Sequence, residues 1–278
     1  MPSAVAALVA ALALAPHASH VEIAVVDTGA TVSIPSIAAH MPSTFDVRTG
    51  LPGVDDANGH GTFVASVVAA SSGDARLLVV KAGSSSGAFT DANEAAAIRY
   101  AIGHGARIIN LSIGGPSTSP TEREAIRYAV THGALVVAAA GNDHGFGNPV
   151  EYPAALLQPV GSRGAGGAGL AVAASDGTGR ASFSGSGSWI SLAAPGVDVS
   201  GALRSGGYTR QSGTSFATAE VSGAAALVWA ADPALTAQQV AWVLKDTASG
   251  HGTWNAGVGY GVIDVAAAVA RARLLALR

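Results

Sequence analysis

A repeated segment in the middle of the chain constrains the fold most strongly. Residues 98–106, Ile-Arg-Tyr-Ala-Ile-Gly-His-Gly-Ala, are echoed by residues 126–134, Ile-Arg-Tyr-Ala-Val-Thr-His-Gly-Ala, and an apolar run follows each copy. Each copy predicts a helix that ends at His-Gly, because glycine accepts the left-handed backbone of a helix stop and histidine suits the negative helix end. We expect His104 and His132 to be structural caps and not metal ligands. Two such helix–strand units predict neighbouring parallel strands of one sheet.

The other segments alternate between strand-like and helix-like patterns in the same way. The strand-like runs cover residues 21–26, 75–81, 108–111, 135–140 and 170–174, with a further strand pair at 199–203 and 207–211. The helical patterns cover residues 61–70, 91–104, 214–231 and 236–247. Asp91 is expected to cap the helix at 91–104, and Asp264 is expected to cap a last helix that follows it. This alternation predicts an α/β fold, with a doubly wound, mostly parallel central sheet and helices on both faces.

The composition favours one compact domain without nucleic-acid partners. A chain of 278 residues, 49% of them hydrophobic, can bury about 75% of its unfolded surface in one core. The formal net charge is −3 and no run of Lys and Arg occurs, so a basic surface for nucleic acid is excluded. The absence of cysteine excludes disulfides and thiol catalysis. We expect a monomer.

Residues 1–20 are expected to be separate from the domain at 21–278. The apolar run 4–15 is too short to span a bilayer, so no stable membrane span is expected. It is either the hydrophobic part of a signal peptide, with small residues at 15–18 for cleavage, or a first helix packed on the domain. A signal peptide predicts a secreted or periplasmic protein, whereas a packed helix leaves a cytoplasmic location open.

Three motifs far apart in the chain contain the side chains of a serine hydrolase. Val-Val-Asp-Thr-Gly contains Asp27, Asn-Gly-His-Gly-Thr contains His60, and Gly-Thr-Ser-Phe-Ala contains Ser215. A serine hydroxyl is a nucleophile only when a base takes its proton, and that base needs a third group to orient it. Each residue alone could be structural: a capping aspartate, a surface histidine or an N-cap serine. Their order, Asp…His…Ser, is one in which this triad recurs and predicts catalysis.

Together with Ala-Ala-Gly-Asn-Asp at 139–143, these motifs resemble those of the subtilisin-like serine peptidases, or subtilases, over roughly residues 21–268. The resemblance implies a subtilisin-like three-layer sandwich. It also implies an endopeptidase that cleaves peptide or protein substrates through an acyl-enzyme, without a cofactor. In this role Ser215 attacks, His60 transfers the proton and Asp27 orients His60. Asn142 and the Ser215 backbone N–H would stabilise the oxyanion.

The resemblance further implies where a substrate binds. An extended peptide would pair with one strand edge through main-chain hydrogen bonds. The expected residues of this edge are Ser112, Ile113, Gly114 and Gly115. The expected opposite wall of the primary specificity pocket is formed by Ala139, Ala140 and Gly141. Glu151 would line the pocket base and favour Lys or Arg on the acyl side of the cut bond, unless its loop turns it to solvent.

The chain departs from the family pattern at several places. Phe63 stands where the family usually has a second histidine, and Ala219-Glu220 stands where it has Pro-His. The short segment 66–81 lacks a calcium-binding loop, and Asp74 alone cannot supply the six to eight oxygens that calcium prefers. No metal site is therefore expected. The glycine-rich residues 161–169 predict a flexible inserted loop.

Three alternatives to a serine peptidase follow from the same sequence. Residues 24–30 resemble the Asp-Thr-Gly loop of aspartic peptidases, but that class pairs two such loops in an all-β fold, which this chain does not predict. The second alternative is a catalytically silent binding protein of the subtilase fold, which usually lacks a triad residue, whereas this chain has all three. A peptide acyl transferase or macrocyclase would use the same residues with an amine as acceptor. The sequence leaves the last two open.

Overall fold

The structure is a computed structural model that describes residues 21–158, 162–164, 167 and 169–278. The predicted N-terminal segment lies outside these residues, as does part of the predicted glycine-rich loop.

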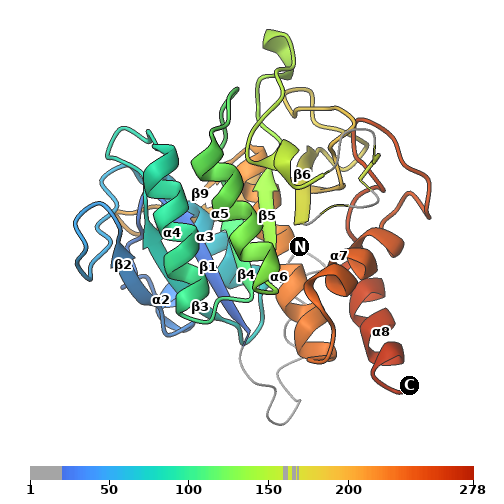
Figure 1. The fold of residues 1–278 in the computed structure, drawn as a ribbon, viewed down its shortest axis with the longest axis horizontal. Helices are drawn as coiled ribbons and strands as arrows, with labels where there is room; N and C mark the ends of the chain where they lie inside the picture. Colours follow the sequence, from blue (N-terminus) through green and yellow to red (C-terminus); the bar gives the residue numbers. More distant parts are fainter. Residues whose placement is uncertain (1–20, 159–161, 165–166, 168) are drawn as a thin grey trace.

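A seven-stranded parallel sheet forms the centre of the molecule (Figure 1). Its strands, in order across the sheet, are β2 (Ser43–Asp46), β3 (Arg76–Lys81), β1 (Glu22–Asp27), β4 (Ile108–Leu111), β5 (Leu135–Ala139), β6 (Gly169–Ser175) and β7 (Leu192–Pro195). Every neighbouring pair is parallel. Chain order runs from β1 to the edge strand β2, returns to β3, and then passes β1 to reach β4. In open α/β sheets, such a reversal creates a ligand-binding crevice at the carboxyl ends of the strands.

Helices cover both faces of the sheet. One face carries α3 (His60–Ser71), α6 (Thr214–Ala231), α7 (Ala237–Asp246) and α8 (Val265–Leu275), and the other carries α4 (Asp91–Gly103) and α5 (Pro120–Thr131). Side chains of β1 alternate between the two apolar cores: Val25 packs with α3 and α6, whereas Ala24 and Val26 pack with α4 and α5. The predicted fold class is confirmed.

The remaining elements are short. They are α2 (Pro35–Ala38), the 3-10 turns η1 (His144–Phe146) and η2 (Ala154–Leu156), and the antiparallel pair β8 (Val199–Ala202) and β9 (Tyr208–Gln211).

Helices α3 and α6 approach closely at a glycine. A Cβ atom on Gly223 of α6 would lie 2.0 Å from the Ser71 Oγ and 2.7 Å from the Ser71 carbonyl carbon. The missing side chain therefore lets the helix that carries His60 pack directly on the helix that carries Ser215. Packing at this density leaves no room for an added methyl group.

The predicted helix caps are confirmed except for one at the start of α4. The N-cap of α4 is Thr90, whose side chain accepts a hydrogen bond from the Asn93 backbone, and not Asp91, which is the first helical residue. Asp264 caps α8 as predicted. His104 and His132 each donate Nδ1–H to a carbonyl four residues earlier, at 2.8 Å, as expected of C-terminal caps.

Candidate active site

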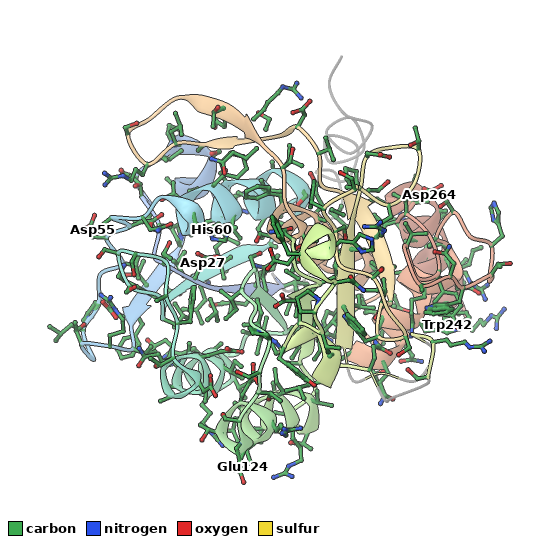
Figure 2. All side chains as sticks on the ribbon, turned by 90° about the horizontal axis from the view of Figure 1, so that it is seen from above. Asp27, Asp55, His60, Glu124, Trp242 and Asp264 are labelled. Carbon is green, nitrogen blue, oxygen red and sulfur yellow. The ribbon has the colours of Figure 1, made fainter. Side chains whose placement is uncertain are left out.

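Asp27 and His60 meet at the carboxyl edge of the sheet. Asp27 is the last residue of β1 and is fully buried, and His60 is the first residue of α3. His60 Nδ1 donates a hydrogen bond to Asp27 Oδ1 at 2.8 Å, while 31% of the imidazole side chain stays exposed. Figure 2 shows the two side chains next to each other, on neighbouring elements. With its proton on Nδ1, the ring has its other nitrogen available to act as a base.

A polar network behind this pair positions the start of α3. Asp56 accepts hydrogen bonds from the Gly59 backbone, the Thr62 backbone and hydroxyl, and the Thr28 hydroxyl, at 2.6–2.8 Å. The Thr28 hydroxyl in turn accepts from the Gly61 backbone at 3.0 Å. Because these bonds bracket His60 on both sides, Asp56 acts on the imidazole through the backbone that carries it.

A glycine is required beside the histidine. A Cβ atom on Gly61 would lie 2.1 Å from the Gly29 carbonyl oxygen and 3.0 Å from the Asp27 carboxylate. Glycine at position 61 therefore allows the helix to start in contact with the aspartate.

The electrostatic field of the aspartates acts on His60. Burial lowers the His60 pKa, but the charge of Asp27, the hydrogen bond to Asp27 and the charge of Asp56 together raise it above the ordinary value of 6.5. The imidazolium is therefore stabilised, as a base that must hold a proton during a reaction requires.

Ser215 lies in the first turn of α6, and its hydroxyl donates to a neighbour other than His60. Ser215 Oγ donates to the Ser112 carbonyl at 3.2 Å, and Ser112 Oγ donates to the Ser215 carbonyl at 2.8 Å. The ring of Phe216, the next residue, lies 6.1 Å from the His60 ring, centroid to centroid. The helix start thus brings Ser215 to the region of the sheet edge that contains His60. Among the described residues, no hydrogen bond joins Ser215 to His60.

Asn142 is held in one orientation by Thr214. The Thr214 backbone N–H and hydroxyl both donate to Asn142 Oδ1, at 2.9 and 3.0 Å. A backbone N–H can only donate, so the atom facing it is the amide oxygen. The Asn142 amide nitrogen is therefore the atom turned away from Thr214, and no hydrogen bond engages it within the described part of the chain.

The expected substrate edge follows β4 directly. Ser112 is buried and Ile113 packs in the core formed with α4 and α5. Gly115 already exchanges two main-chain hydrogen bonds with Tyr152, at 3.0 and 2.9 Å. A peptide added to this edge would therefore use main-chain groups before Gly115.

Glu151 lies between the two expected walls. It is 5% exposed. Its side chain fills the space next to Gly114 and Gly141. A Cβ atom added to Gly114 would lie 3.0 Å from Glu151 Oε2, and one added to Gly141 would lie 2.2 Å from Glu151 Cγ. Burial, and then the charge of Asp143, raises the pKa of Glu151 above its ordinary value. Ala139 and Ala140, the other residues of the expected wall, are buried at the end of β5. The carboxylate thus faces the interior and not solvent.

Several residues of the site were not predicted from the sequence. The sequence analysis did not assign a role to Asp56, Thr214 or Lys81. Lys81 Nζ donates hydrogen bonds to the carbonyls of Thr28, which follows Asp27, and of Asp55. Lys81 could have been found from the sequence, because it is a charged residue at the end of the apolar strand Leu-Leu-Val-Val-Lys. Phe63, at the position of the missing family histidine, packs on Phe216 with a centroid separation of 4.4 Å.

Two further properties concern the described residues only. Their His, Asp and Glu side chains form no group of three or more that could hold a metal ion. None of their helices has the length and apolar character needed to cross a membrane.

Known proteins match this chain over most of its length. The model of the subtilase family matches residues 18–261. An alkaline protease of Alkalihalobacillus alcalophilus is 36% identical over 260 residues, which are 90% of this chain and 64% of that protein. Subtilisin Savinase of Lederbergia lenta is also 36% identical, over 90% of this chain and 91% of the relative. The solved protease domain of PatA, in a mutant form, superposes with a TM-score of 0.77 at 28% identity, covering 91% of this chain and 95% of that domain.

Proposed function

The chain belongs to the subtilase family, and we propose that it is a serine endopeptidase that uses Ser215, His60 and Asp27. The observation that carries this proposal is the 2.8 Å hydrogen bond between His60 Nδ1 and the buried carboxylate of Asp27, at the sheet edge where α6 presents Ser215. Fixing the proton on Nδ1 makes the other ring nitrogen the base, as triad chemistry requires.

The proposed reaction begins with a rotation of the Ser215 side chain. Its hydroxyl leaves the Ser112 carbonyl and donates to His60 Nε2. As the oxygen attacks the substrate carbonyl, a C–O bond forms, the carbonyl π electrons move to its oxygen, and His60 takes the proton. Collapse of this intermediate breaks the C–N bond and His60 returns the proton to the leaving amine. Water then repeats the sequence on the acyl-enzyme and releases the acid.

We propose that two N–H groups stabilise the negative oxygen. Ser215 is the second residue of α6, so its N–H has no carbonyl one turn earlier to accept it, and the positive end of the helix dipole lies there. The Asn142 amide, oriented by Thr214, supplies the second donor. Loss of one such donor costs about 2.7–4 kcal/mol of transition-state stabilisation, a magnitude known from a subtilisin itself.

The proposed primary pocket favours basic side chains. Glu151 is buried between Gly114 and Gly141, and among the described residues it forms no ion pair. An unpaired carboxylate at the base of a pocket is complementary to Lys or Arg. We therefore propose cleavage after basic residues.

The test uses labelling and product mass together. The purified chain should react with a serine-directed fluorophosphonate and cleave a peptide library, and Ser215→Ala should abolish both. Ser205→Ala, in an exposed turn, is the control and should change neither. An unlabelled Ser215 would favour the silent binding protein instead. Products joined to an amine, without the mass of added water, would favour acyl transfer. A location outside the cytoplasm stays a prediction.

A further inference from the structure

Helix α8 is apolar on its outward face as well as on its inward face. The inward residues are buried in the core that α8 shares with α6 and α7: Val265, Ala268, Val269 and Ala272. The outward face carries exposed Ala266, Ala270 and Leu274, spaced four residues apart, and Leu277 follows in the turn that ends the helix. A surface helix usually carries polar side chains on its outward face, and a helix that is apolar all round is usually buried in protein or lipid. The outward face of α8 therefore indicates a surface that another molecule covers.

A tryptophan of α7 extends this apolar surface. Trp242 is 43% exposed, Leu274 is 57% exposed and Leu277 is 83% exposed. The guanidinium carbon of Arg271 lies 5.2 Å from the centroid of a Trp242 ring, and Leu274 is three residues after Arg271, which makes the two neighbours on the helix surface. Figure 1 shows α7 and α8 side by side. Trp242, Leu274 and Leu277 thus form one exposed apolar surface, which we call the α7/α8 patch. Exposed apolar surfaces of this kind mark interaction sites.

Positive charge borders the α7/α8 patch. Residues 265–278 contain Arg271, Arg273 and Arg278 and no acidic residue. Arg271 pairs with Asp246 at 3.6 Å. Arg273 and Arg278 are exposed, and neither forms an ion pair within the described part of the chain. The whole chain has a net charge of −3, so this positive charge is a local feature. It makes the patch complementary to a surface that is both apolar and anionic.

Two candidate occupants from the chain itself do not match this charge. In a dimer formed through α8, the arginines of both copies would meet, while Asp246, the carboxylate beside the patch, already pairs with Arg271. Residues 1–20 contain an apolar run but no Asp or Glu, so they offer no side-chain carboxylate to Arg273 or Arg278. Either occupant would cover the apolar side chains and leave the positive border without counter-charge.

We propose that the α7/α8 patch docks the protein on an anionic lipid surface. Trp242, Leu274 and Leu277 would lie against the upper part of the acyl chains. Arg273 and Arg278 would contact the headgroup phosphates. Helices that lie in a membrane interface place Trp and Leu at the acyl boundary and Lys or Arg toward anionic headgroups. None of the helices in the described part of the chain could cross a membrane, so this contact would be peripheral.

A lipid surface fits the patch better than an acidic protein does. Apart from the three arginines, residues 265–278 carry no side chain that can form a hydrogen bond, whereas specific protein interfaces depend on several such bonds. Figure 2 also shows Trp242 well separated from Asp27 and His60. Docking through the patch would therefore leave the candidate active site open. The inference goes beyond the proposed peptidase activity and does not depend on it.

The experiment compares two kinds of vesicle. Binding of the unaltered chain to phosphatidylglycerol vesicles, which are anionic, and to phosphatidylcholine vesicles, which have no net charge, is measured by flotation. Tryptophan emission is recorded in parallel. Trp229 is fully buried and should not respond, whereas the exposed Trp242 should, and Trp242→Phe identifies its signal. Inorganic phosphate without lipid tests whether a free anion is sufficient.

Two pairs of variants separate the apolar part of the patch from its charge. Leu274→Ser removes an apolar contact, and its control is Leu51→Ser, which is 62% exposed at another place on the surface. Arg273→Gln removes a charge, and its control is Arg127→Gln, whose side chain is 73% exposed on α5. All four side chains are exposed, so each variant should keep the fold, which its melting temperature checks.

We expect binding to phosphatidylglycerol and not to phosphatidylcholine, with a shift of Trp242 emission to shorter wavelength. Added salt should weaken this binding, because it screens the arginines. Arg273→Gln should weaken it by about 5-fold and Leu274→Ser by about 10-fold. Leu51→Ser and Arg127→Gln should bind as the unaltered chain does, and phosphate alone should leave the emission unchanged.

Equal binding to the two lipids, or no binding to phosphatidylglycerol at low salt, would overturn the proposal. So would binding that survives Leu274→Ser and Arg273→Gln together. An emission shift with phosphate alone would assign the arginines to a free anion instead. A dimer in sedimentation equilibrium that Leu274→Ser dissociates would give the patch to a second copy. Binding of polyglutamate without binding of vesicles would give it to an acidic protein. Each result can also be obtained with Ser215→Ala, so none depends on cleavage.

Discussion

Ser112 and Ser215 exchange hydrogen bonds, each side chain donating to the other residue's carbonyl, at 2.8 Å and 3.2 Å. The exchange joins the end of β4 to the start of α6. It continues inward, because Asn110 donates to Ser112 Oγ at 2.9 Å and Ser222 donates to Asn110 Oδ1 at 2.9 Å. A buried polar chain of four residues therefore links the proposed nucleophile to the proposed substrate edge.

Replacing Asn110 by alanine should destabilise the protein and slow it. Asn110 is fully buried, so the change leaves Ser112 Oγ without its donor and Ser222 without its acceptor. We expect the free energy of unfolding to fall by about 2–3 kcal/mol in urea denaturation, with a lower kcat/KM. Ser222→Ala, which breaks only one bond of the chain, should cost about 1 kcal/mol. Equal losses would show that the Asn110–Ser112 hydrogen bond adds nothing to stability.

The pH dependence of activity should follow His60. The His60 pKa lies above 6.5, since the field and hydrogen bond of Asp27 and the field of Asp56 together exceed the effect of burial, which lowers it. His60 must be neutral to accept a proton, so kcat/KM should rise with pH through a midpoint above 6.5. Asp27→Asn removes the Asp27 charge that raises the His60 pKa and leaves that of Asp56, so the midpoint should move to lower pH. It should also lower kcat by about 10⁴, because the preferred tautomer is lost.

The control for this prediction is Asp55→Asn. Asp55 is exposed and its backbone carbonyl, which accepts from Lys81, is retained. A midpoint that moved equally in both variants would show a general charge effect and not the Asp27–His60 contact.

Selectivity next to the cut bond should depend on the charge of Glu151. Burial and then Asp143 raise its pKa above the ordinary 4.5, so the preference for Lys and Arg should strengthen as pH rises through that pKa. Glu151→Gln should remove the preference and its pH dependence, and leave cleavage after neutral residues unchanged. Ratios of kcat/KM for paired peptides with arginine and citrulline measure this. A preference kept by Glu151→Gln would assign the specificity to another group.

Gly223→Ala should destabilise the protein although alanine is the better helix former. Alanine gains about 1 kcal/mol over glycine in a helix, but here its Cβ would lie 2.0 Å from Ser71 Oγ. Overpacking of this kind costs about 1–3 kcal/mol, and the backbone of Ser71 cannot move without shifting α3. We expect a lower melting temperature and lower activity, since His60 lies on the same helix.

Gly103→Ala provides the comparison for that variant. Gly103 ends α4, and nothing lies within 4 Å of its added Cβ. Its melting temperature should stay the same or rise. A similar loss in both variants would mean that the α3–α6 contact is not the cause.

Sequence patterns predicted the central strands because these are continuous apolar runs, and they predicted α6 at Thr214–Ala231. They missed β2, Ser-Thr-Phe-Asp, which is a polar edge strand with one large apolar residue. They also missed β7, Leu-Ala-Ala-Pro, which is too short to show a period. Both strands exist because a neighbouring strand supplies hydrogen bonds, and that is a long-range effect.

The sequence by itself determined the parallel α/β architecture and the types and order of the candidate catalytic residues, because periodicity and short motifs are local properties. Only the tertiary structure decided which atoms meet: Asn142 Oδ1 with Thr214, Asp56 with the start of α3, and Ser112 with Ser215. These partners are separated along the chain and converge because parallel strands bring their carboxyl ends, and the helices that follow them, to one edge of the sheet. A short sequence pattern cannot predict such contacts, because it holds no information on residues far away in the chain.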